Sequence, residues 1–327
     1  MRHFVAPETA GAERRQFAED VEYYLSLSPR QLPSRYLYDD LGSALFDAIC
    51  HLPWYEITRT ERDLLRLHAG TILHRLEPLA TLVELGPGNG DKLADLLDTA
   101  ADDAALTVHL VDISPSALEA SSRALDDRDN VTIVTHQAEY ETGLAAATAA
   151  RESRGSFGRT LALFLGSNIG NFDPPGADAF LLNIRAALSQ GDAFLIGADL
   201  VKDEAALLQA YDDPLGVTAA FNRNLLVRVN QELDADFDLD GFAHRAVWNP
   251  AASRIEMHLV SRRRQRVRIP CARLDIVFEP DETIWTESSY KYQPRGMLGM
   301  LERAGFRKLN QWLDERGTFA LTLVEAA

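Results

Sequence analysis

The sequence predicts an α/β protein with a mostly parallel sheet and a second, smaller α+β domain. From about residue 60 to residue 200 apolar runs alternate with helical patterns, which is typical of βαβ units. A glycine-rich turn follows the first of these runs, and residues 200–284 break the alternation. A chain of 327 residues is long for one hydrophobic core, so we expect two domains.

Five apolar runs predict the parallel strands. They are Ala80–Leu85, Leu106–Ile113, Val131–Thr135, Thr160–Gly166 and Ala193–Ala198. The helical patterns between them include Lys92–Thr99, Ser116–Leu125 and Ala177–Leu188. Right-handed crossovers through such helices place the strands parallel in one sheet.

The C-terminal residues are expected to complete this sheet. Arg295–Ala304 has a helical pattern, and two further strands, Lys308–Leu313 and Thr318–Val324, flank the turn at residues 315–317. A helix followed by an antiparallel pair brings the sheet to seven strands.

Residues 200–284 predict an α+β insertion. The expected helices are Asp203–Tyr211 and Val217–Leu233, and the expected strands are Phe242–Trp248, Arg254–Ser261 and Arg264–Ile269. The segment Asn249–Ser253 between the first two strands is a hairpin-type turn. The first 57 residues also lie outside the βαβ alternation, so the domains are expected at 58–199 plus 285–327, and at 1–57 plus 200–284.

The charge of the chain argues against nucleic acid as a partner. The formal net charge is −16, whereas a nucleic-acid binder needs Lys and Arg to replace the counterions on phosphates. One basic run, Arg262–Arg268, alternates like a hairpin strand with a solvated face.

The sequence favours a cytoplasmic protein that does not enter the membrane. No apolar run approaches the ~20 residues of a membrane span. The first residues lack the apolar core of a signal peptide. The two cysteines, Cys50 and Cys271, are therefore expected to be free, buried thiols.

The glycine-rich turn predicts the cofactor. Dinucleotide sites use G-x-G-x-x-G, in which the last glycine lets the helix pack on the sheet. Here glycines stand at Gly86, Gly88 and Gly90, and Asp91 occupies the place of that last glycine. With Glu84, Asp91 would repel a pyrophosphate and favour a cationic ligand. S-adenosyl-L-methionine (SAM) carries a sulfonium and an ammonium and no phosphate, so the turn predicts a SAM-dependent methyltransferase. An ordinary glycine-rich βα turn is the alternative.

Other cofactor residues are expected where the following strands end. Asp112 ends the second strand, where a carboxylate accepts hydrogen bonds from both ribose hydroxyls. Ser114 supplies the helix start, so Asp112 is not needed as a cap. Glu139 and Tyr140 follow the third strand and are expected at the adenine. Lys92 lies on the first turn after the glycines, with an ordinary surface lysine as the alternative.

Several separated segments show a family resemblance. They are Tyr36–Phe46, Leu52–Tyr55 with Thr58–Glu61, Thr81–Lys92, Leu165–Phe172, Ala210–Asp213 with Gly216–Asn222, and Thr286–Tyr292. In these segments the chain resembles the L-histidine Nα-methyltransferase family of ergothioneine biosynthesis. The resemblance implies a class I SAM-methyltransferase core, a Rossmann-like seven-stranded sheet, with a second α+β substrate-binding domain.

The resemblance also implies residue roles. The loop residues Glu84 and Gly88 are expected to bind the cofactor. The resemblance implies further cofactor positions at Tyr38, Gly86, Lys92, Asp112, Glu139 and Tyr140. It places the amino-acid pocket at Tyr55, Gly166, Asn171, Tyr211, Thr218, Met257, Glu287 and Ser289. Asn171 and Tyr38 are expected to be catalytic, and no metal is implied.

The residue types in this pocket suit L-histidine. The Asn171 amide and the Tyr211 hydroxyl can hold the carboxylate and the amine of an amino acid. Glu287 and Ser289 lie two apart on an expected strand, so they face the same way and offer an acceptor and a donor to an imidazole. Met257 supplies an adaptable apolar wall. Without the resemblance, loop capping, core packing and a half-exposed strand carboxylate would explain Asn171, Tyr211 and Glu287.

The expected reaction is in-line displacement of the methyl group from sulfur by the neutral amine. Three transfers would give Nα,Nα,Nα-trimethylhistidine (hercynine). Three alternatives stay open: another acceptor such as tryptophan, a non-catalytic SAM-binding subunit, and an NAD-linked oxidoreductase. The glycine spacing argues against the last of these. We expect a monomer.

Overall fold

The computed structural model of the chain describes residues 7–99, 105–154 and 158–327, and they form two compact units. Unit 1 comprises the residues up to Tyr55 together with Glu204–Ser288, and unit 2 comprises Glu56–Asp203 and Ser289–Ala327. The boundaries lie after residues 55, 203 and 288, where the sequence suggested 57, 199 and 284.

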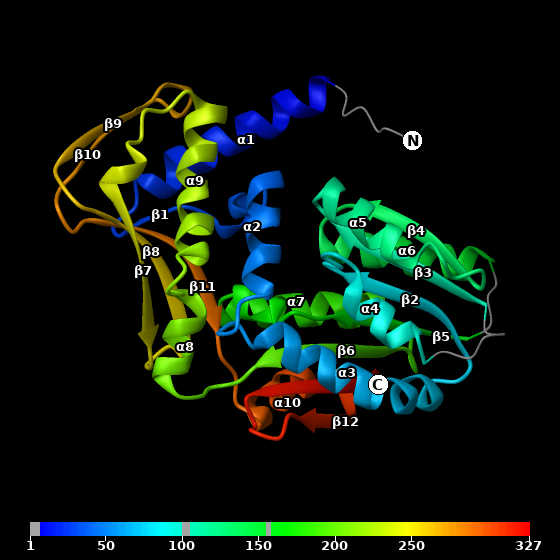
Figure 1. The fold of residues 1–327 in the computed structure, drawn as a ribbon. Helices are drawn as coiled ribbons and strands as arrows, with labels where there is room; N and C mark the ends of the chain where they lie inside the picture. Colours follow the sequence, from blue (N-terminus) through cyan, green and yellow to red (C-terminus); the bar gives the residue numbers. More distant parts are fainter. Residues whose placement is uncertain (1–6, 100–104, 155–157) are drawn as a thin grey trace. The chain divides into compact units, whose positions relative to one another are not determined.

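Unit 2 contains a seven-stranded sheet (Figure 1). Its strands are β2 (Leu79–Leu85), β3 (Leu106–Asp112), β4 (Val131–Gln137), β5 (Arg159–Phe164), β6 (Ala193–Asp199), β12 (Phe306–Leu313) and β13 (Phe319–Ala326). Their order is β12-β13-β6-β5-β2-β3-β4. Strands β2 to β6 are parallel, and β13 is antiparallel to both of its neighbours, β6 and β12. The predicted parallel core and its antiparallel closure are therefore confirmed, and the topology is that of a class I methyltransferase.

Helices cover both faces of this sheet. They are α3 (Ile57–Arg75), α4 (Asp91–Leu97), α5 (Pro115–Leu125), α6 (Tyr140–Arg154), α7 (Pro174–Ala187) and α10 (Pro294–Arg303), with the short 3-10 helix η2 (Asn168–Asn171). Helix α4 contacts both α3 and α5, whereas α7 contacts both α6 and α10. The second group encloses a core in which Phe164, Phe180 and Phe194 are fully buried. Strands β5 and β6 are buried almost throughout, which explains why the sequence shows continuous apolar runs there.

The strand order creates a switch point at the carboxyl ends of β2 and β5. From β2 the chain moves outward to β3 and β4, and it then returns to the other side of β2 as β5 and β6. Ligands of open α/β sheets bind at such points, because the loops leaving the two central strands diverge there. The loops after β2 and β5 carry Gly86 and Gly166.

Unit 1 is an α+β unit. Its helices are α1 (Pro7–Leu25), α2 (Asp40–Cys50), α8 (Glu204–Tyr211) and α9 (Val217–Leu233), with 3-10 helices η1 (Ser34–Leu37), η3 (Leu239–Gly241) and η4 (Pro270–Ala272). Its strands are β1 (Arg30–Gln31), β7 (Phe242–Asn249), β8 (Arg254–Ser261), β9 (Gln265–Ile269), β10 (Leu274–Phe278) and β11 (Thr283–Tyr290), whose last two residues belong to unit 2. Helix α9 packs against α2, β7 and β8.

Three details differ from the sequence expectations. Strand β9 pairs antiparallel with β10, and the sequence did not suggest a strand at β10. The strand expected to reach Gly166 ends at Phe164. The cysteines are free but not buried, since Cys50 is half-buried and Cys271 is exposed, where its thiol contacts Asp234.

Candidate functional site

The glycine loop after β2 depends on a backbone that only glycine adopts readily. Gly86, Gly88 and Gly90 have φ values of 74°, 57° and 85°. A Cβ on Gly86 would lie 3.2 Å from both the Tyr140 hydroxyl and the Asn168 amide nitrogen. A Cβ on Gly90 would lie 2.8 Å from the Cα of a residue in α5. Gly90 therefore permits helix packing, and Gly86 lets the first residues of two later helices, Tyr140 and Asn168, approach the loop backbone.

Glu84 lies at the end of β2 in an unusual electrostatic position. Its residue surface is 1% exposed, and Oε2 has no hydrogen-bond partner among the described residues. Burial raises the pKa of Glu84 to about 8, with the Lys92 ammonium acting in the opposite direction and Glu61 and Asp112 adding to the rise. A buried carboxyl group without a partner is costly, and a cationic ligand would compensate for it.

The residues expected at the ribose and adenine lie at the ends of β3 and β4. Asp112 accepts a hydrogen bond from the Ser114 backbone N–H at 2.8 Å. Burial raises the pKa of Asp112, although the hydrogen bond from Ser114 acts to lower it. Ser114 caps α5, as the sequence suggested, by accepting from the Ala117 N–H at 3.3 Å. Glu139 is exposed, whereas burial raises the pKa of Tyr140, whose ring packs edge-on against Phe164.

Lys92 is not an ordinary surface lysine. Its Nζ lies 2.6 Å from Oε2 of Glu61, whose side chain has no exposed surface. The backbone N–H of Gly166 donates to both carboxylate oxygens of Glu61, at 2.9 and 2.7 Å. Glu61 therefore joins the helix after β2 to the loop after β5. Sequence reasoning assigned no role to Glu61, although Thr58–Glu61 was one of the segments that carried the resemblance.

The loop after β5 presents Asn171 beside the end of β11. Asn171 ends the 3-10 helix η2 and is exposed. The preceding residue, Gly170, packs so closely that a Cβ there would lie 2.8 Å from the Tyr290 carbonyl oxygen and 3.5 Å from Ser289 Oγ. The two predicted substrate residues Asn171 and Ser289 are thus held by neighbouring backbone segments of unit 2.

In unit 1 the predicted tyrosines belong to one aromatic cluster. The rings of Tyr55 and Tyr211 lie 6.1 Å apart, edge to face. Phe46 contacts Tyr55 at 6.3 Å and Tyr38 at 5.5 Å, and Tyr38 also contacts Phe221 at 5.5 Å. Tyr55 and Tyr211 are buried, while Tyr38 is half-buried.

Tyr211 is held in place by a buried histidine that the sequence did not single out. Nε2 of His244 lies 2.7 Å from the Tyr211 carbonyl oxygen, and the Asn222 amide nitrogen lies 2.9 Å from Nδ1. The amide N–H donates to Nδ1, so Nε2 carries the proton that the carbonyl accepts. Burial lowers the pKa of His244, which favours this neutral form.

The start of α9 positions Thr218. Its backbone N–H donates to Oδ1 of Asp213 at 2.7 Å. Burial opposes ionisation of Asp213, but hydrogen bonds from Thr218 and Val217 hold its pKa below the usual value. Thr218 is 2% exposed, so this turn fixes a small polar side chain in a buried position.

The strands β8 and β11 carry the residues expected at the imidazole. Met257 is 2% exposed, and its carbonyl accepts a hydrogen bond from the Thr286 hydroxyl at 3.0 Å. Glu287 and Ser289 are 8% and 6% exposed, so Glu287 is not the half-exposed strand carboxylate of the alternative interpretation.

The predicted residues divide between the units. The cofactor residues Glu84, Gly86, Gly88, Lys92, Asp112, Glu139 and Tyr140 lie in unit 2, together with the substrate residues Gly166, Asn171 and Ser289. Unit 1 contains Tyr38, Tyr55, Tyr211, Thr218, Met257 and Glu287. Neither the predicted cofactor residues nor the predicted substrate residues all lie in a single unit.

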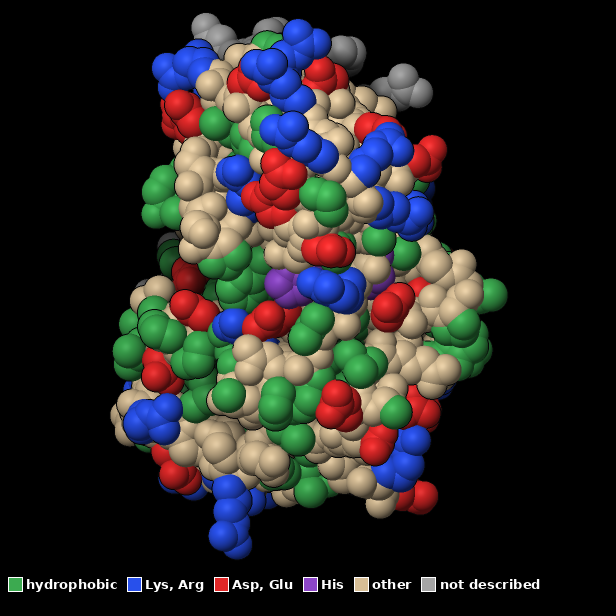
Figure 2. All heavy atoms as spheres, turned by 90° about the vertical axis from the view of Figure 1, so that its left-hand side faces the viewer, with side chains coloured by type: hydrophobic (Ala, Val, Ile, Leu, Met, Phe, Trp, Pro, Cys, Tyr) green, Lys and Arg blue, Asp and Glu red, His purple; other side chains and the backbone are tan. Residues whose placement is uncertain are grey.

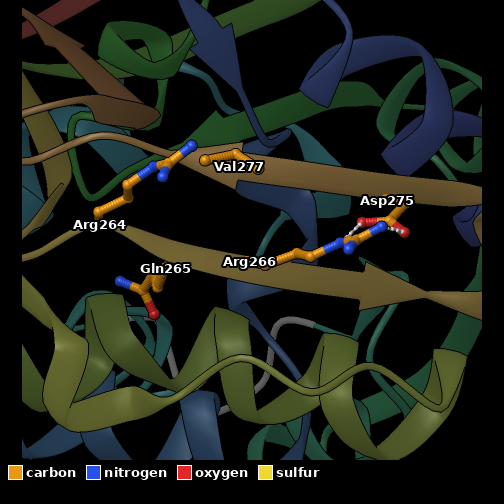
Figure 3. Close-up of a pocket in the computed structure, with 5 residues that line it drawn as sticks. All are labelled: Arg264, Gln265, Arg266, Asp275 and Val277. Carbon is orange, nitrogen blue, oxygen red and sulfur yellow. Dashed lines mark hydrogen bonds and ion pairs between the residues drawn. The ribbon is translucent and has the colours of Figure 1, made fainter.

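The basic run at the start of β9 forms a solvated face, and three of its arginines are paired with carboxylates. Arg264, Arg266 and Arg268 pair with Glu279, Asp275 and Asp236, at 3.0, 2.6 and 3.1 Å. Figure 3 shows the hollow beside this strand, with Arg266 and Asp275 pointing toward each other. Blue and red side chains alternate on the face drawn in Figure 2. This surface is not continuously positive.

Among residues 7–99, 105–154 and 158–327, no helix is long and apolar enough to cross a membrane. The same part of the chain contains no group of three or more His, Cys, Asp or Glu side chains that could hold a metal ion.

The residues of unit 2 fit SAM. Oε2 of Glu84, which has no hydrogen-bond partner in the described part of the chain, suits a cationic ligand, and Gly86, without a Cβ, leaves room beside Tyr140. Asp91 on the first turn of α4 disfavours a phosphate.

Comparisons with known proteins also indicate a SAM-dependent methyltransferase. A family model described as histidine-specific methyltransferase, SAM-dependent, matches residues 17–326. The chain is 39% identical over 326 residues to a histidine N-alpha-methyltransferase of Mycolicibacterium smegmatis, covering 99% of this chain and 98% of that protein. It is 41% identical over 306 residues to one of Mycobacterium tuberculosis, covering 93% of each chain. It is also 29% identical over 310 residues to the ergothioneine biosynthesis protein 1 of Schizosaccharomyces pombe, covering 91% of this chain and 39% of that protein.

Proposed function

Because the chain belongs to the SAM-dependent, histidine-specific methyltransferase family, we propose that it transfers methyl groups to the α-amino group of L-histidine. The observation that carries the choice of histidine is the burial of a carboxylate and a hydroxyl, Glu287 and Ser289, on one strand. A neutral imidazole offers one N–H and one acceptor nitrogen, which match these two groups.

When bound, SAM supplies the electrophilic methyl group. Glu84 would compensate its positive charge, Asp112 would bind the ribose hydroxyls, and Glu139 and Tyr140 would bind the adenine. Gly86 and Gly88 would allow the cofactor to approach the loop backbone closely. Lys92 and Tyr38 would also contact the cofactor.

In the amino-acid pocket, Asn171 would bind the carboxylate and accept a hydrogen bond from the amine. The Tyr211 hydroxyl would donate to the same carboxylate. The amine must be neutral to attack, and a neighbouring sulfonium lowers an ammonium pKa. Alignment then supplies the rate, since oriented reactants gain about 7–11 kcal/mol. Tyr55, Gly166, Thr218 and Met257 would shape the remaining walls.

We further propose three successive transfers, giving trimethylhistidine as the first step of ergothioneine biosynthesis. The growing cation needs aromatic faces, which Tyr38, Tyr55 and Tyr211 would provide by cation–π contact. The protein would act as a cytoplasmic monomer, without nucleic acid or membrane as partner. The net charge of −16 and the matched arginines of β9 support the part of this proposal that excludes nucleic acid.

Mass spectrometry of the products formed from SAM and each common amino acid tests the proposal. We expect trimethylhistidine from the parent, and its loss in Glu287→Ala. The matched control is Glu256→Ala, which removes a carboxylate of β8 that pairs with Arg254 at 2.7 Å and has no assigned role. The control is expected to keep the histidine product.

The other outcomes separate the alternatives. Methylation of tryptophan instead of histidine would retain the cofactor and discard the imidazole assignment. SAM binding without any product would favour a non-catalytic subunit. A product that stops at monomethylhistidine would refute the trimethylation.

A further inference from the structure

Two buried carboxyl groups of unit 2 interact with one ammonium group in different ways. The Glu61 side chain has no exposed surface, and its Oε2 lies 2.6 Å from Lys92 Nζ. The backbone N–H of Gly166 donates to both oxygens of Glu61. Glu84 is 1% exposed, yet its Oε2 has no hydrogen-bond partner within the ranges that the structure describes. Lys92 therefore pairs with Glu61 and leaves Oε2 of Glu84 without a hydrogen bond.

The packing of unit 2 holds this ion pair in place. Glu61 lies on α3 and Lys92 on the first turn of α4, and the two helices are in contact. A Cβ on Gly197 in β6 would lie 1.8 Å from Glu61 Oε1, and a Cβ on Gly166 would lie 3.1 Å from Lys92 Nζ. Glycine at both positions therefore leaves space for the pair. A Glu61 side chain enclosed in this way cannot turn away from Lys92 without losing its hydrogen bonds from Gly166.

This pairing determines how much negative charge a bound ligand meets. The charges of Lys92 and Glu61 largely cancel, so an ionised Glu84 adds a negative charge that the ammonium offsets only in part. If Glu61 were neutral, the same ammonium would act on Glu84 alone. We propose that Glu61 is a positioning residue of the cofactor site. By holding Lys92, it leaves the Glu84 carboxylate to compensate the positive charge of the cofactor, and so favours SAM over its product S-adenosylhomocysteine.

The two forms of the cofactor are suitable probes of this effect. SAM has a sulfonium where S-adenosylhomocysteine has a neutral thioether, and they otherwise differ by one methyl group only. A change in the ratio of their affinities between parent and variant therefore reports the response of the site to one positive charge. The inference rests on the SAM site of the proposed function. It does not depend on histidine as the acceptor, because no acceptor takes part in the binding.

Two ion pairs between α3 and α4 supply a matched pair of variants. Glu61→Gln keeps the size of the side chain and one oxygen that can accept from Gly166, and it removes the charge. Asp95→Asn removes a carboxylate of α4 that pairs at 2.6 Å with Arg62, the residue after Glu61 on α3. Both substitutions break an ion pair between the same two helices. Only Glu61→Gln changes the charge that Lys92 meets in its ion pair.

The decisive quantity is the affinity for SAM divided by the affinity for S-adenosylhomocysteine. Calorimetric titration of each compound, without an acceptor, gives both affinities. The titrations are made above the pKa of Glu84, which burial raises to about 8, so that this carboxyl group is ionised in every protein. We expect the ratio to fall about fivefold or more in Glu61→Gln, because Lys92 then offsets the charge of Glu84. Asp95→Asn should keep the parent ratio.

The pH dependence of SAM binding is a second readout, which a merely structural role of Glu61 would not change. Burial gives the largest rise in the pKa of Glu84, Glu61 and Asp112 add to it, and Lys92 opposes it. With Glu61 neutral, the increase in SAM affinity with pH should therefore begin at a lower pH than in the parent. Asp95→Asn should follow the parent.

An unchanged affinity ratio in Glu61→Gln, or an equal fall in Asp95→Asn, would overturn the inference. Should Glu61→Gln not fold, Gly197→Ala displaces Glu61 from Lys92 without changing any charge. The ratio must fall in that variant too, and a parent-like ratio there would refute the role of the ion pair. A parent that binds neither compound would refute the SAM site, and the inference with it. Failure of histidine as the acceptor would refute only the proposed substrate, since the affinity ratio is measured without it.

Discussion

Replacing Glu84 by glutamine should make the unliganded protein more stable and the cofactor complex weaker. The substitution keeps the size of the side chain and removes its ability to ionise. Burial raises the pKa of Glu84 from 4.5 to about 8. Between these two values the folded protein holds a proton that the unfolded chain has released. Below pH 4.5 the raised pKa therefore has no effect on the free energy of unfolding. As the pH rises from there toward about 8, the free energy of unfolding falls.

The magnitude follows from the linkage relation. One proton difference corresponds to about 1.4 kcal/mol per pH unit, so the full shift costs roughly 5 kcal/mol above about pH 8. Glu84 is 1% exposed, so solvent screening reduces this value little. A typical domain has only about 5–15 kcal/mol of stability, which makes the effect easy to measure.

The assay compares the free energies of unfolding of the parent and Glu84→Gln in urea, without ligand, from about pH 5 to about pH 8. The difference between the two proteins isolates this one group. We expect the parent to lose about 3 kcal/mol relative to the variant over two pH units. The control is Glu77→Gln, an exposed carboxylate just before the same strand, which should follow the parent.

SAM binding supplies the second readout. A cation beside Glu84 favours the carboxylate, so the affinity of the parent for SAM should rise as the pH approaches 8, with release of a proton. The affinity of Glu84→Gln should be lower, without this pH dependence. Equal pH dependence of unfolding in parent and variant would refute the reasoning, because it would mean that Glu84 is already ionised in the folded protein.

Two further predictions concern the supports of the site. A Cβ on Gly197 would lie 1.8 Å from Glu61 Oε1, so Gly197→Ala should displace Glu61, lower stability by about 1–3 kcal/mol and weaken SAM binding in calorimetry. Gly70→Ala on α3, where a Cβ meets nothing within 4 Å, is the control, and an equal loss there would contradict the packing argument. Burial lowers the pKa of His244, so the neutral imidazole stabilises the folded protein above about pH 6.5. Below that pH the unfolded chain binds a proton that the folded protein does not, and the free energy of unfolding should fall by up to ~1.4 kcal/mol per pH unit. His244→Gln should remove that part of the acid sensitivity in urea unfolding, and an unchanged slope would disprove it.

The parallel core could be predicted because its signals are local. Buried strands need continuous apolar runs, and the loop at Gly86 needs glycine for its positive φ, so both are visible in the order of residues. Strand β10 escaped prediction although four of its five residues are apolar, because Val277 occupies an exposed position and so hides the alternation expected of a strand with one buried face. Such a short strand is specified by its partner β9 and not by its own pattern.

By itself the sequence determined the α/β class, the cofactor type and the residue types offered to the substrate. Only the tertiary structure decided the electrostatic state of those residues. Glu61, Lys92 and Gly166 are far apart in sequence. Only folding places the buried carboxylate of Glu61 against the Lys92 ammonium and the Gly166 backbone N–H. Lys291 reads as an ordinary lysine until Asp199 and Ser289 surround it. Burial and pairing depend on what a side chain meets in space, and a linear pattern does not contain that information.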